Sequence, residues 1–196
     1  MKKLVLITCI LSIGIFVLLS FFLKNIVSSS AFKDQIVLGN KNSTVEVLVF
    51  SDFHCGYCRE FAIDIFPVVQ DKYIRKGKIK YVFVPLNFVN EKTKEANALL
   101  CVNNYVPTVT NNFLKHLYFK NVTLDSCIEM MLISKADKSK IKQCSYNNLY
   151  KKTLQNNLKA ARKMMKGNFS VPAVFVNNKR IEVNEKDIIH AIAGEL

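Results

Sequence analysis

The amino-acid sequence predicts an α/β fold in which two strand-containing halves are separated by a block of helices. Three observations lead to this prediction. Two apolar runs, residues 45–50 and 80–84, flank an amphipathic segment, and such a strand–helix–strand unit implies a right-handed crossover with parallel strands. Residues 91–166 are helical in character. Residues 171–183 are typical of a β-hairpin, and a short helical segment follows them.

The first half begins with a short predicted strand at residues 35–39, which ends in a cluster of turn formers. The strand at residues 45–50 then leads into a helix. One buried stripe of that helix is predicted from apolar residues at intervals of four, three and one: Phe61, Ile65, Val68 and Val69. Pro67 predicts a kink or an early end of the helix. The next central strand, residues 80–84, ends before Pro85.

The helical block contains several separate helix signals. Residues 94–102 carry Ala98, Leu99 and Val102 inward, and Pro107–Thr108 open a second helix. Residues 123–126 supply cap candidates for a third helix, around Cys127 to Ile133. The last helix has the clearest period: Tyr150, Leu154, Leu158, Ala161 and Met165, with Gly167 at its end.

The second half is predicted as a hairpin and a closing helix. Residues 171–176 form its first strand, Asn177–Asn178 a tight turn, and residues 179–183 the antiparallel return. Asn184 then caps a helix that carries three isoleucines: Ile188, Ile189 and Ile192.

Two thiols lie between the first central strand and its helix. Cys55–Gly56–Tyr57–Cys58 places a pair of cysteines three residues apart at a predicted helix N-terminus, where they are able to form a disulfide. Unpaired amides and the positive end of the helix dipole favour the thiolate of Cys55, which then attacks other disulfides. Cys58, one turn further along, is placed to attack the resulting mixed disulfide and release the partner.

Other kinds of site for this thiol pair are a structural disulfide and half of a zinc site. Zinc needs a second pair of ligands at comparable spacing, and His116 and His190 are isolated in the sequence. His54 directly precedes Cys55, so two roles remain open for it: a cation that stabilises the thiolate, or a solvent-facing side chain.

The chain has 196 residues, a net charge of +13 and six cysteines. No basic cluster is interleaved with aromatic residues, so we expect a solvated basic surface and no nucleic-acid partner. Two of the three cysteines in the helical block, Cys101, Cys127 and Cys144, are expected to pair, and the third to be a buried thiol. The sequence does not choose between Cys127–Cys144 and Cys101–Cys144.

The N-terminal residues predict a membrane-spanning or signal helix. Residues 4–23 are an unbroken apolar run of about 30 Å as a helix, between Lys2–Lys3 and Lys24. Their length favours an uncleaved anchor, while residues 27–31 offer a signal-peptidase site. The positive-inside rule places the body of the protein outside the cytoplasm. We therefore expect an anchor or signal segment at residues 1–25, a linker at 26–34, and one domain at 35–196.

Together with Ser170–Val171–Pro172–Ala173, the thiol pair resembles the thioredoxin fold, and within it the DsbA-like disulfide oxidoreductases of the bacterial cell envelope. The block of helices at about residues 91–166, inserted between the βαβ and ββα halves, belongs to this resemblance. It implies that Pro172 follows a cis peptide bond and faces the thiols, and that Val171 and Pro172 hold a substrate strand. It implies no cofactor and no metal, since the Cys55–Cys58 disulfide is the redox group.

Two residues depart from the family pattern. The buried carboxylate that many thioredoxin-fold proteins carry six residues before the first cysteine falls on Val49, so proton transfer lacks this aid or Asp52 supplies it. Strongly oxidising DsbA proteins usually have histidine where this chain has Tyr57. Gly56–Tyr57 between the cysteines resembles the corresponding residues of the DsbC-type isomerases. Those isomerases have an N-terminal dimerisation domain, and we expect no counterpart of it in this chain. His54, Gly56 and Tyr57 are therefore the candidates for tuning the thiolate.

The favoured hypothesis is a cell-envelope thiol-disulfide oxidoreductase that forms disulfides in exported proteins. Its partners are reduced or misoxidised exported proteins and a membrane redox partner that reoxidises or reduces the site. We expect it on the periplasmic side, anchored in the inner membrane by residues 4–23 or secreted after cleavage near residues 28–31. The alternatives are an isomerase or reductase that uses the same site and, more remotely, a non-enzymatic metal carrier.

Overall fold

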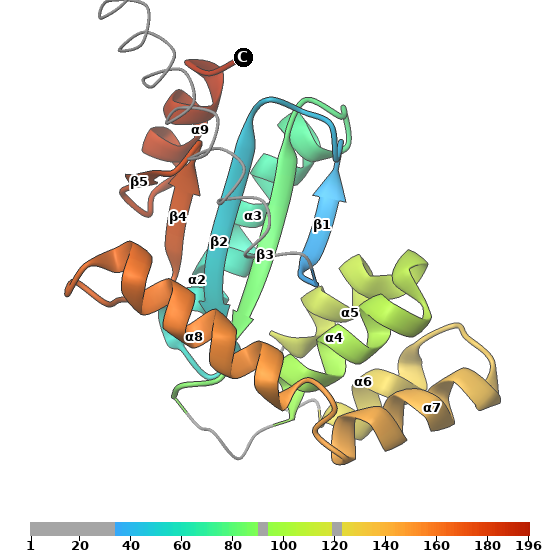
Figure 1. Ribbon diagram of the computed structural model, residues 1–196. Coiled ribbons are helices and arrows are strands. Elements are labelled where there is room, and N and C mark those ends of the chain that lie inside the picture. The colour runs from blue at the N-terminus through green and yellow to red at the C-terminus, as the bar shows by residue number, and fades with distance from the viewer. Residues whose placement is uncertain (1–33, 90–93, 119–122) are drawn as a thin grey trace, which may run out of the picture. The chain divides into compact units, whose positions relative to one another are not determined.

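A five-stranded sheet with the order β1-β3-β2-β4-β5 is the centre of the fold (Figure 1). The computed structural model describes residues 34–89, 94–118 and 123–196. The expected anchor or signal segment and all of the linker except Asp34 lie outside the described residues. Within the described ranges, no helix is both long and apolar enough to cross a membrane.

The strand pairing confirms the predicted crossover. The strands are β1 (Ile36–Gly39), β2 (Glu46–Asp52), β3 (Lys80–Leu86), β4 (Ala173–Val176) and β5 (Lys179–Ile181). β2 and β3 are parallel, and the other three pairs are antiparallel. Val49 lies opposite Phe83 on one side and Val174 on the other, so β2 is central.

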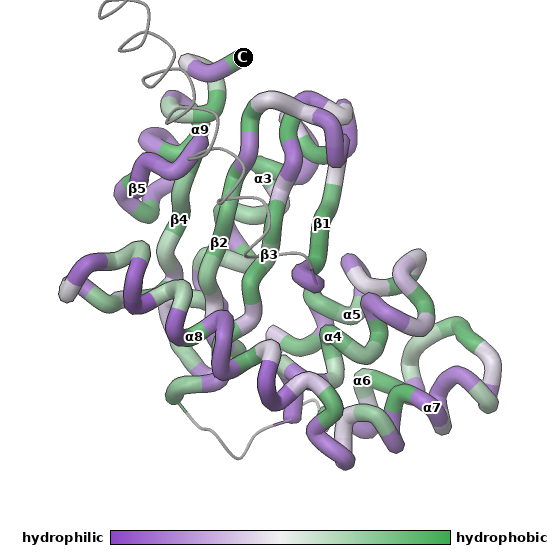
Figure 2. The backbone as a smooth tube through the Cα atoms, in the orientation of Figure 1, coloured by the Kyte–Doolittle hydropathy of each residue, from purple (hydrophilic) through white to green (hydrophobic). Residues whose placement is uncertain are grey.

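The core fills both faces of β2, β3 and β4, which are hydrophobic along most of their length (Figure 2). Phe50 and Phe175 pack edge to face with their ring centroids 6.0 Å apart, and Phe66 packs on Tyr81 at 5.2 Å. Helix α8 (Lys151–Met165) covers one face of the sheet and α3 (Phe66–Val69) lies behind the other (Figure 1).

The helix after the thiols is longer and less regular than predicted. It runs through α2 (Gly56–Glu60), a π-helical turn (Phe61–Ile65), α3 and a second π-helical turn (Gln70–Ile74). The predicted buried stripe is wrong in two of its four members, because Ile65 and Val68 are only half-buried. Each π turn adds a residue and shifts the buried face. Phe66 is buried in their place.

Pro67 lies in the first turn of α3, directly after the first π-helical turn. Proline has no N–H to donate, and its ring collides with the carbonyl four residues earlier in a regular α-helix. The widened turn before it accommodates both effects, so the helix continues where the sequence predicts a kink or an early end.

In its described residues, the helical block contains five α-helices: α4 (Glu95–Tyr105), α5 (Thr110–Leu117), α6 (Leu124–Met130), α7 (Lys135–Tyr146) and α8. A 3-10 turn, Pro107–Val109, precedes α5. The predicted cap of α6 is confirmed, since the Thr123 side chain accepts from the Ser126 N–H. Helix α7 was not predicted as a separate helix, and Ser134 caps it in the same way.

A disulfide between Cys101 of α4 and Cys144 of α7 decides between the two pairings. Its two Cα atoms are 6.1 Å apart, and Cys127 is left as a buried free thiol, as predicted. Buried Asn97 reinforces the junction, because its side-chain N–H₂ donates to the carbonyls of Cys144 and Ser145 at 3.1 and 3.0 Å.

The C-terminal half follows the prediction closely. Asn177 and Asn178 adopt φ angles of 43° and 68°, the left-handed pair that a two-residue hairpin turn requires. Both strands are shorter than predicted: β4 begins at Ala173, after the Val171–Pro172 peptide bond, and β5 ends at Ile181. Asn184 caps α9 (Glu185–Ala193), whose Ile188 and Ile192 are buried.

Candidate redox site

The thiol pair lies where the carboxyl end of β2 meets the helix. Cys55 is the N-cap of α2, with extended φ and ψ angles of −89° and 124°, and its side chain is partly exposed. Cys58 lies within α2 and is fully buried. Both carry free thiols. The predicted arrangement, a strand that delivers two thiols to the start of a helix, is present.

Buried Asp52 holds the loop between β2 and α2. One carboxylate oxygen accepts the His54 N–H at 2.9 Å, and the other accepts the N–H groups of Phe88 and Val89 at 2.8 and 3.2 Å. The carboxylate thus ties the redox loop to the segment after β3. Val49, where other family members carry the buried carboxylate, is a fully buried residue in the middle of β2.

Burial dominates the chemistry of Cys58. It raises the pKa of this thiol to about 12, against the opposing effect of hydrogen bonds from the Asp52 N–H and the Ser51 side chain. The Asp52 nitrogen lies 3.4 Å from Cys58 Sγ. Ser51 in turn shares a hydrogen bond with the hydroxyl of Tyr118, a residue of the helical block. Cys58 is therefore a neutral thiol near pH 7, with donors ready to stabilise its thiolate.

This difference between the cysteines predicts selective alkylation of the reduced protein. We expect iodoacetamide to modify Cys55 about 100-fold faster than Cys58, because Cys58 is buried and stays protonated far below its pKa. Raising the pH from about 6 to about 9 should leave Cys58 unmodified for the same reason. Mass spectrometry of the Cys55, Cys58 and Cys127 peptides measures this, with the urea-unfolded chain as control. Equal labelling of Cys55 and Cys58 in the native protein contradicts it.

Val171 and Pro172 lie against the thiols, although more than 110 residues of chain separate them. The Cys55 thiol donates to the Val171 carbonyl over 3.5 Å, and the Val171–Pro172 peptide bond is cis. The resemblance implied the cis peptide bond, and the hydrogen bond from Cys55 to Val171 was not predicted. The site is thus built from both halves of the fold.

The three candidates for tuning the thiolate lie in different surroundings. His54 Nε2 is 3.3 Å from the Glu95 carboxylate at the start of α4. The sequence predicted either a cation beside the thiolate or a solvent-facing side chain, and it did not predict this contact with Glu95. A side chain at Gly56 would meet open space, so nothing covers the approach there. Tyr57 is 73% exposed. Within the described ranges, no three His, Cys, Asp or Glu side chains are arranged to hold a metal ion.

Several contacts of the site come from the helical block and were not predicted. They are the Glu95 carboxylate on His54, the Tyr118 hydroxyl on Ser51, and the Tyr118 carbonyl, which accepts from Arg59 Nε at 2.7 Å. Tyr118 also packs on Phe53 with ring centroids 4.8 Å apart. Nothing local in the sequence around Tyr118 pointed to the site.

A strand–CxxC–helix unit that faces a Val–Pro loop, with helices inserted between the two halves, defines a thioredoxin fold of the DsbA-like kind. A family model described as thioredoxin matches residues 31–193. The chain belongs to this family, and its fold is that of the DsbA-like thiol-disulfide oxidoreductases.

The chain is similar to curated relatives over a limited stretch. Disulfide bond formation protein D of Bacillus subtilis (strain 168) is 41% identical over 58 residues, which is 30% of this chain and 26% of the relative. The probable disulfide bond formation protein D of Bacillus cereus is 33% identical over 61 residues, 31% of this chain and 28% of the relative. The match thus spans about a quarter of the length of these relatives.

Solved structures match most of the chain. Oxidised BdbD from Bacillus subtilis has a TM-score of 0.73 at 25% identity, covering 84% of this chain and 94% of that one. DsbA from Chlamydia trachomatis also has a TM-score of 0.73, at 20% identity, covering 82% and 90%. The resemblance of the fold therefore extends well beyond the neighbourhood of the cysteines.

Proposed function

We propose that the protein is a thiol-disulfide oxidoreductase that forms disulfide bonds in exported proteins through Cys55–Gly56–Tyr57–Cys58. One observation carries the proposal: a partly exposed thiol at a helix start lies beside the Val171 carbonyl, with a buried partner thiol in the same helix. The names of the Bacillus relatives and the fold shared with BdbD support it.

The reaction begins with the Cys55–Cys58 disulfide. A thiolate of the client protein attacks Cys55 Sγ, the Cys55–Cys58 bond breaks, and Cys58 leaves as a thiolate. The Asp52 N–H and the Ser51 side chain stabilise that thiolate until it takes up a proton. A second client thiolate then attacks the client sulfur of the mixed disulfide and releases Cys55. The client loses two electrons and two protons, and the site gains them.

Val171 and Pro172 form the proposed clamp for the client chain. The Val171 main chain is within hydrogen-bond reach of Cys55 Sγ, so a strand that pairs there brings its cysteine to the reacting sulfur. Gly56 adds no side chain next to Cys55, and in the described part of the chain no atom lies within 4 Å of the position that a Cβ at Gly56 would occupy. Holding the two sulfurs in this geometry makes the exchange effectively intramolecular.

The direction of electron flow has an alternative: the same site could serve an isomerase or reductase instead of an oxidase. Gly56–Tyr57 between the cysteines favours an isomerase or reductase, since Tyr57 brings no positive charge to a thiolate. The Glu95 carboxylate also offsets any positive charge on His54. We propose that residues 4–23 anchor the protein on the periplasmic side of the inner membrane. There a membrane redox partner reoxidises the Cys55 and Cys58 thiols.

Two measurements on the full chain in detergent test the function. Catalytic oxidation of a reduced test protein is expected, and its absence would contradict the proposed disulfide-forming function. The reduction potential, measured in glutathione buffers, separates the directions. A value near the oxidising end, about −120 mV, supports the oxidase, and a value near −270 mV supports the reductase.

A further inference from the structure

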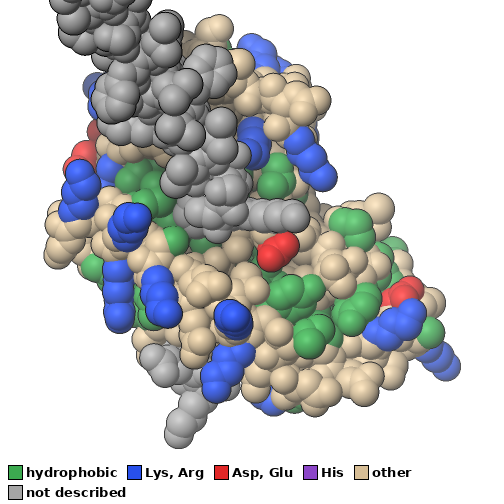
Figure 3. All heavy atoms as spheres, in the orientation of Figure 1, with side chains coloured by type: hydrophobic (Ala, Val, Ile, Leu, Met, Phe, Trp, Pro, Cys, Tyr) green, Lys and Arg blue, Asp and Glu red, His purple; other side chains and the backbone are tan. Residues whose placement is uncertain are grey.

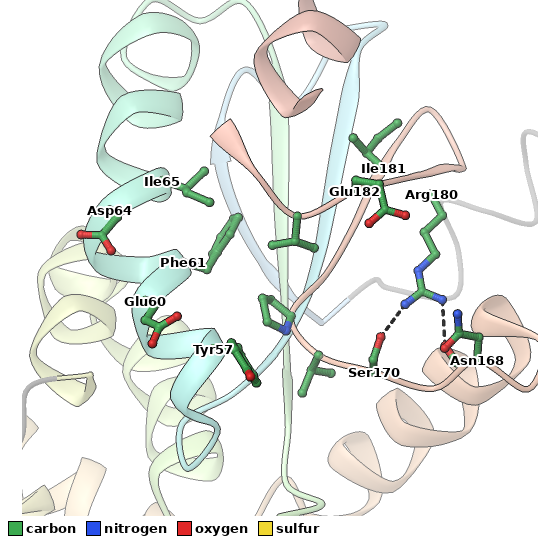
Figure 4. A pocket seen from close by; sticks show the side chains of 13 residues that line it. Tyr57, Glu60, Phe61, Asp64, Ile65, Asn168, Ser170, Arg180, Ile181 and Glu182 are labelled. Atoms are coloured by element: carbon green, nitrogen blue, oxygen red, sulfur yellow. Dashed lines mark hydrogen bonds between the residues drawn. The ribbon is translucent and has the colours of Figure 1, made fainter. Parts of the chain in front are cut away.

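A groove beside the thiols has its own chemical character. It is a cavity of about 540 Å³ between the α2 helix and the β4–β5 hairpin, and it begins at Tyr57 and Pro172. Phe61 and Ile65 point into it from the helix (Figure 4). These two side chains form an apolar patch in a lining that is otherwise mainly polar. Val171 and Pro172 also line the groove, so it is continuous with the clamp that we propose for the client chain.

Carboxylates are concentrated on the rim of this groove. Only 15 of the 196 residues are acidic, yet three of the 13 residues that line the groove are: Glu60, Asp64 and Glu182. Glu60 and Asp64 lie on the helix side and Glu182 on the hairpin side (Figure 4). All three are exposed, and in the described part of the chain none of them forms an ion pair.

The one basic residue of the lining is held by neutral partners. Arg180 donates to the Asn168 carbonyl at 2.8 Å and to the Ser170 hydroxyl at 2.7 Å, away from the helix side of the groove (Figure 4). Three carboxylates and one guanidinium leave the lining with a formal charge of −2.

The acidic rim differs in charge from the chain as a whole, which is strongly basic. The net charge is +13, and the face that carries α8 shows many more Lys and Arg than Asp and Glu side chains (Figure 3). The net charge thus repels a basic client, while the carboxylates of the groove attract it locally. Within a Debye length of about 10 Å the local charges dominate over the distant ones.

We propose that this groove selects client segments that carry lysine or arginine close to the reacting cysteine. The proposal rests on the proposed function, and it names the client chemistry of the same site. The aliphatic stem of such a side chain packs on Phe61 and Ile65, while its cationic end reaches the carboxylates of the rim.

The helix sets the distance at which the basic residue should lie. Glu60 and Asp64 follow Cys55 by five and nine positions, which is about 7 and 14 Å along a helix axis. An extended client covers about 3.3 Å per residue, so it spans these distances in roughly two to four residues. A basic residue two to four positions from the client cysteine is therefore in reach of the rim.

The test uses the oxidised full chain in detergent and three reduced two-cysteine peptides. They differ only in carrying Lys, Gln or Glu three positions from the cysteines. Single-turnover mixing gives the rate constant for oxidation of each peptide. Each rate is divided by the rate of the same peptide with the uncharged disulfide of 2-mercaptoethanol, which removes the effect of neighbouring charge on peptide thiol reactivity. We expect the Lys peptide to exceed the Glu peptide by about three- to tenfold at low salt.

The groove variant carries Glu60→Gln, Asp64→Asn and Glu182→Gln, and it should lose this preference. A matched control, Asp71→Asn with Glu129→Gln and Glu195→Gln, changes the net charge equally outside the groove and should keep it. Equal normalised rates for the three peptides in the wild type overturn the proposal, and so does a preference that survives in the groove variant. Reduction by dithiothreitol checks that each variant carries the site disulfide.

The same experiment separates this proposal from the proposed function. If all three peptides are oxidised at equal normalised rates, only the charge selection fails. If the site disulfide reacts with dithiothreitol but oxidises no peptide, the proposed function is contradicted. The charge selection of clients is then contradicted as well, because it depends on that function. A groove variant that keeps its peptide preference but is reoxidised more slowly in membranes assigns the groove to the membrane partner instead, which overturns the proposal.

Discussion

Replacing Cys58 by serine is expected to trap the protein in mixed disulfides with its partners. Cys58 lies in the same first turn of helix as Cys55, and it is the thiol that attacks a mixed disulfide on Cys55. Without it, release depends on the partner's own second thiol or on a thiol from solution. Loss of a well-oriented intramolecular attack slows release by a factor on the order of 10³ or more.

The trap is measured by mixing the reduced variant with a disulfide-bonded test peptide, quenching with acid, and weighing the products by mass spectrometry. Dithiothreitol should release the peptide. Cys55→Ser should form no complex and should oxidise no client, because it removes the attacking sulfur. Cys127→Ser is the matched control, since Cys127 is a buried thiol of α6. Complexes as abundant with Cys55→Ser as with Cys58→Ser would contradict the assignment of the two roles.

Features with a local cause were predictable from the sequence. The thiol pair at the helix start, the Asn177–Asn178 turn and the caps of α6 and α9 each depend on residues within a few positions of one another. The parallel pairing of β2 and β3 follows from the length and burial of the segments. Local propensity and hydrophobic period carry this information directly.

Features that depend on contacts between distant segments were not predictable. Glu95 reaches His54 across 41 residues, and Tyr118 reaches Ser51 across 67. Their positions follow from how the helical block packs on the βαβ half, which no single segment encodes. The π-helical turn at Phe61–Ile65 shifts the buried face from Ile65 and Val68 to Phe66, and a search for regular 3.6-residue periodicity misses it.

The helical block therefore supplies part of the redox site as well as covering it. Glu95 is the first residue of α4, and Cys101 lies in the same helix. The disulfide to Cys144 fixes α4 against α7, and Asn97 joins the same two helices through the Cys144 and Ser145 carbonyls. The placement of Glu95 against His54 thus depends on how firmly α4 is held.

Removing this disulfide is expected to cost the largest amount of stability of any change outside the redox pair. Cys101 and Cys144 are separated by 43 residues, and closing a loop of that length in the unfolded chain lowers its entropy by the equivalent of roughly 4 kcal/mol. The double variant Cys101→Ala with Cys144→Ala should therefore lower the free energy of unfolding by about 3–4 kcal/mol. Each single variant should lose a similar amount, because either one opens the loop.

Urea unfolding followed by far-UV circular dichroism measures the loss, since the chain contains no tryptophan for fluorescence. Cys127→Ala is the control, because it removes a buried sulfur without opening a loop and should cost about 1 kcal/mol. If the double variant is no less stable than this control, the disulfide does not constrain the unfolded chain as inferred. Single variants much more stable than the double would show that the two cysteines act independently, and the covalent link between α4 and α7 would then contribute little.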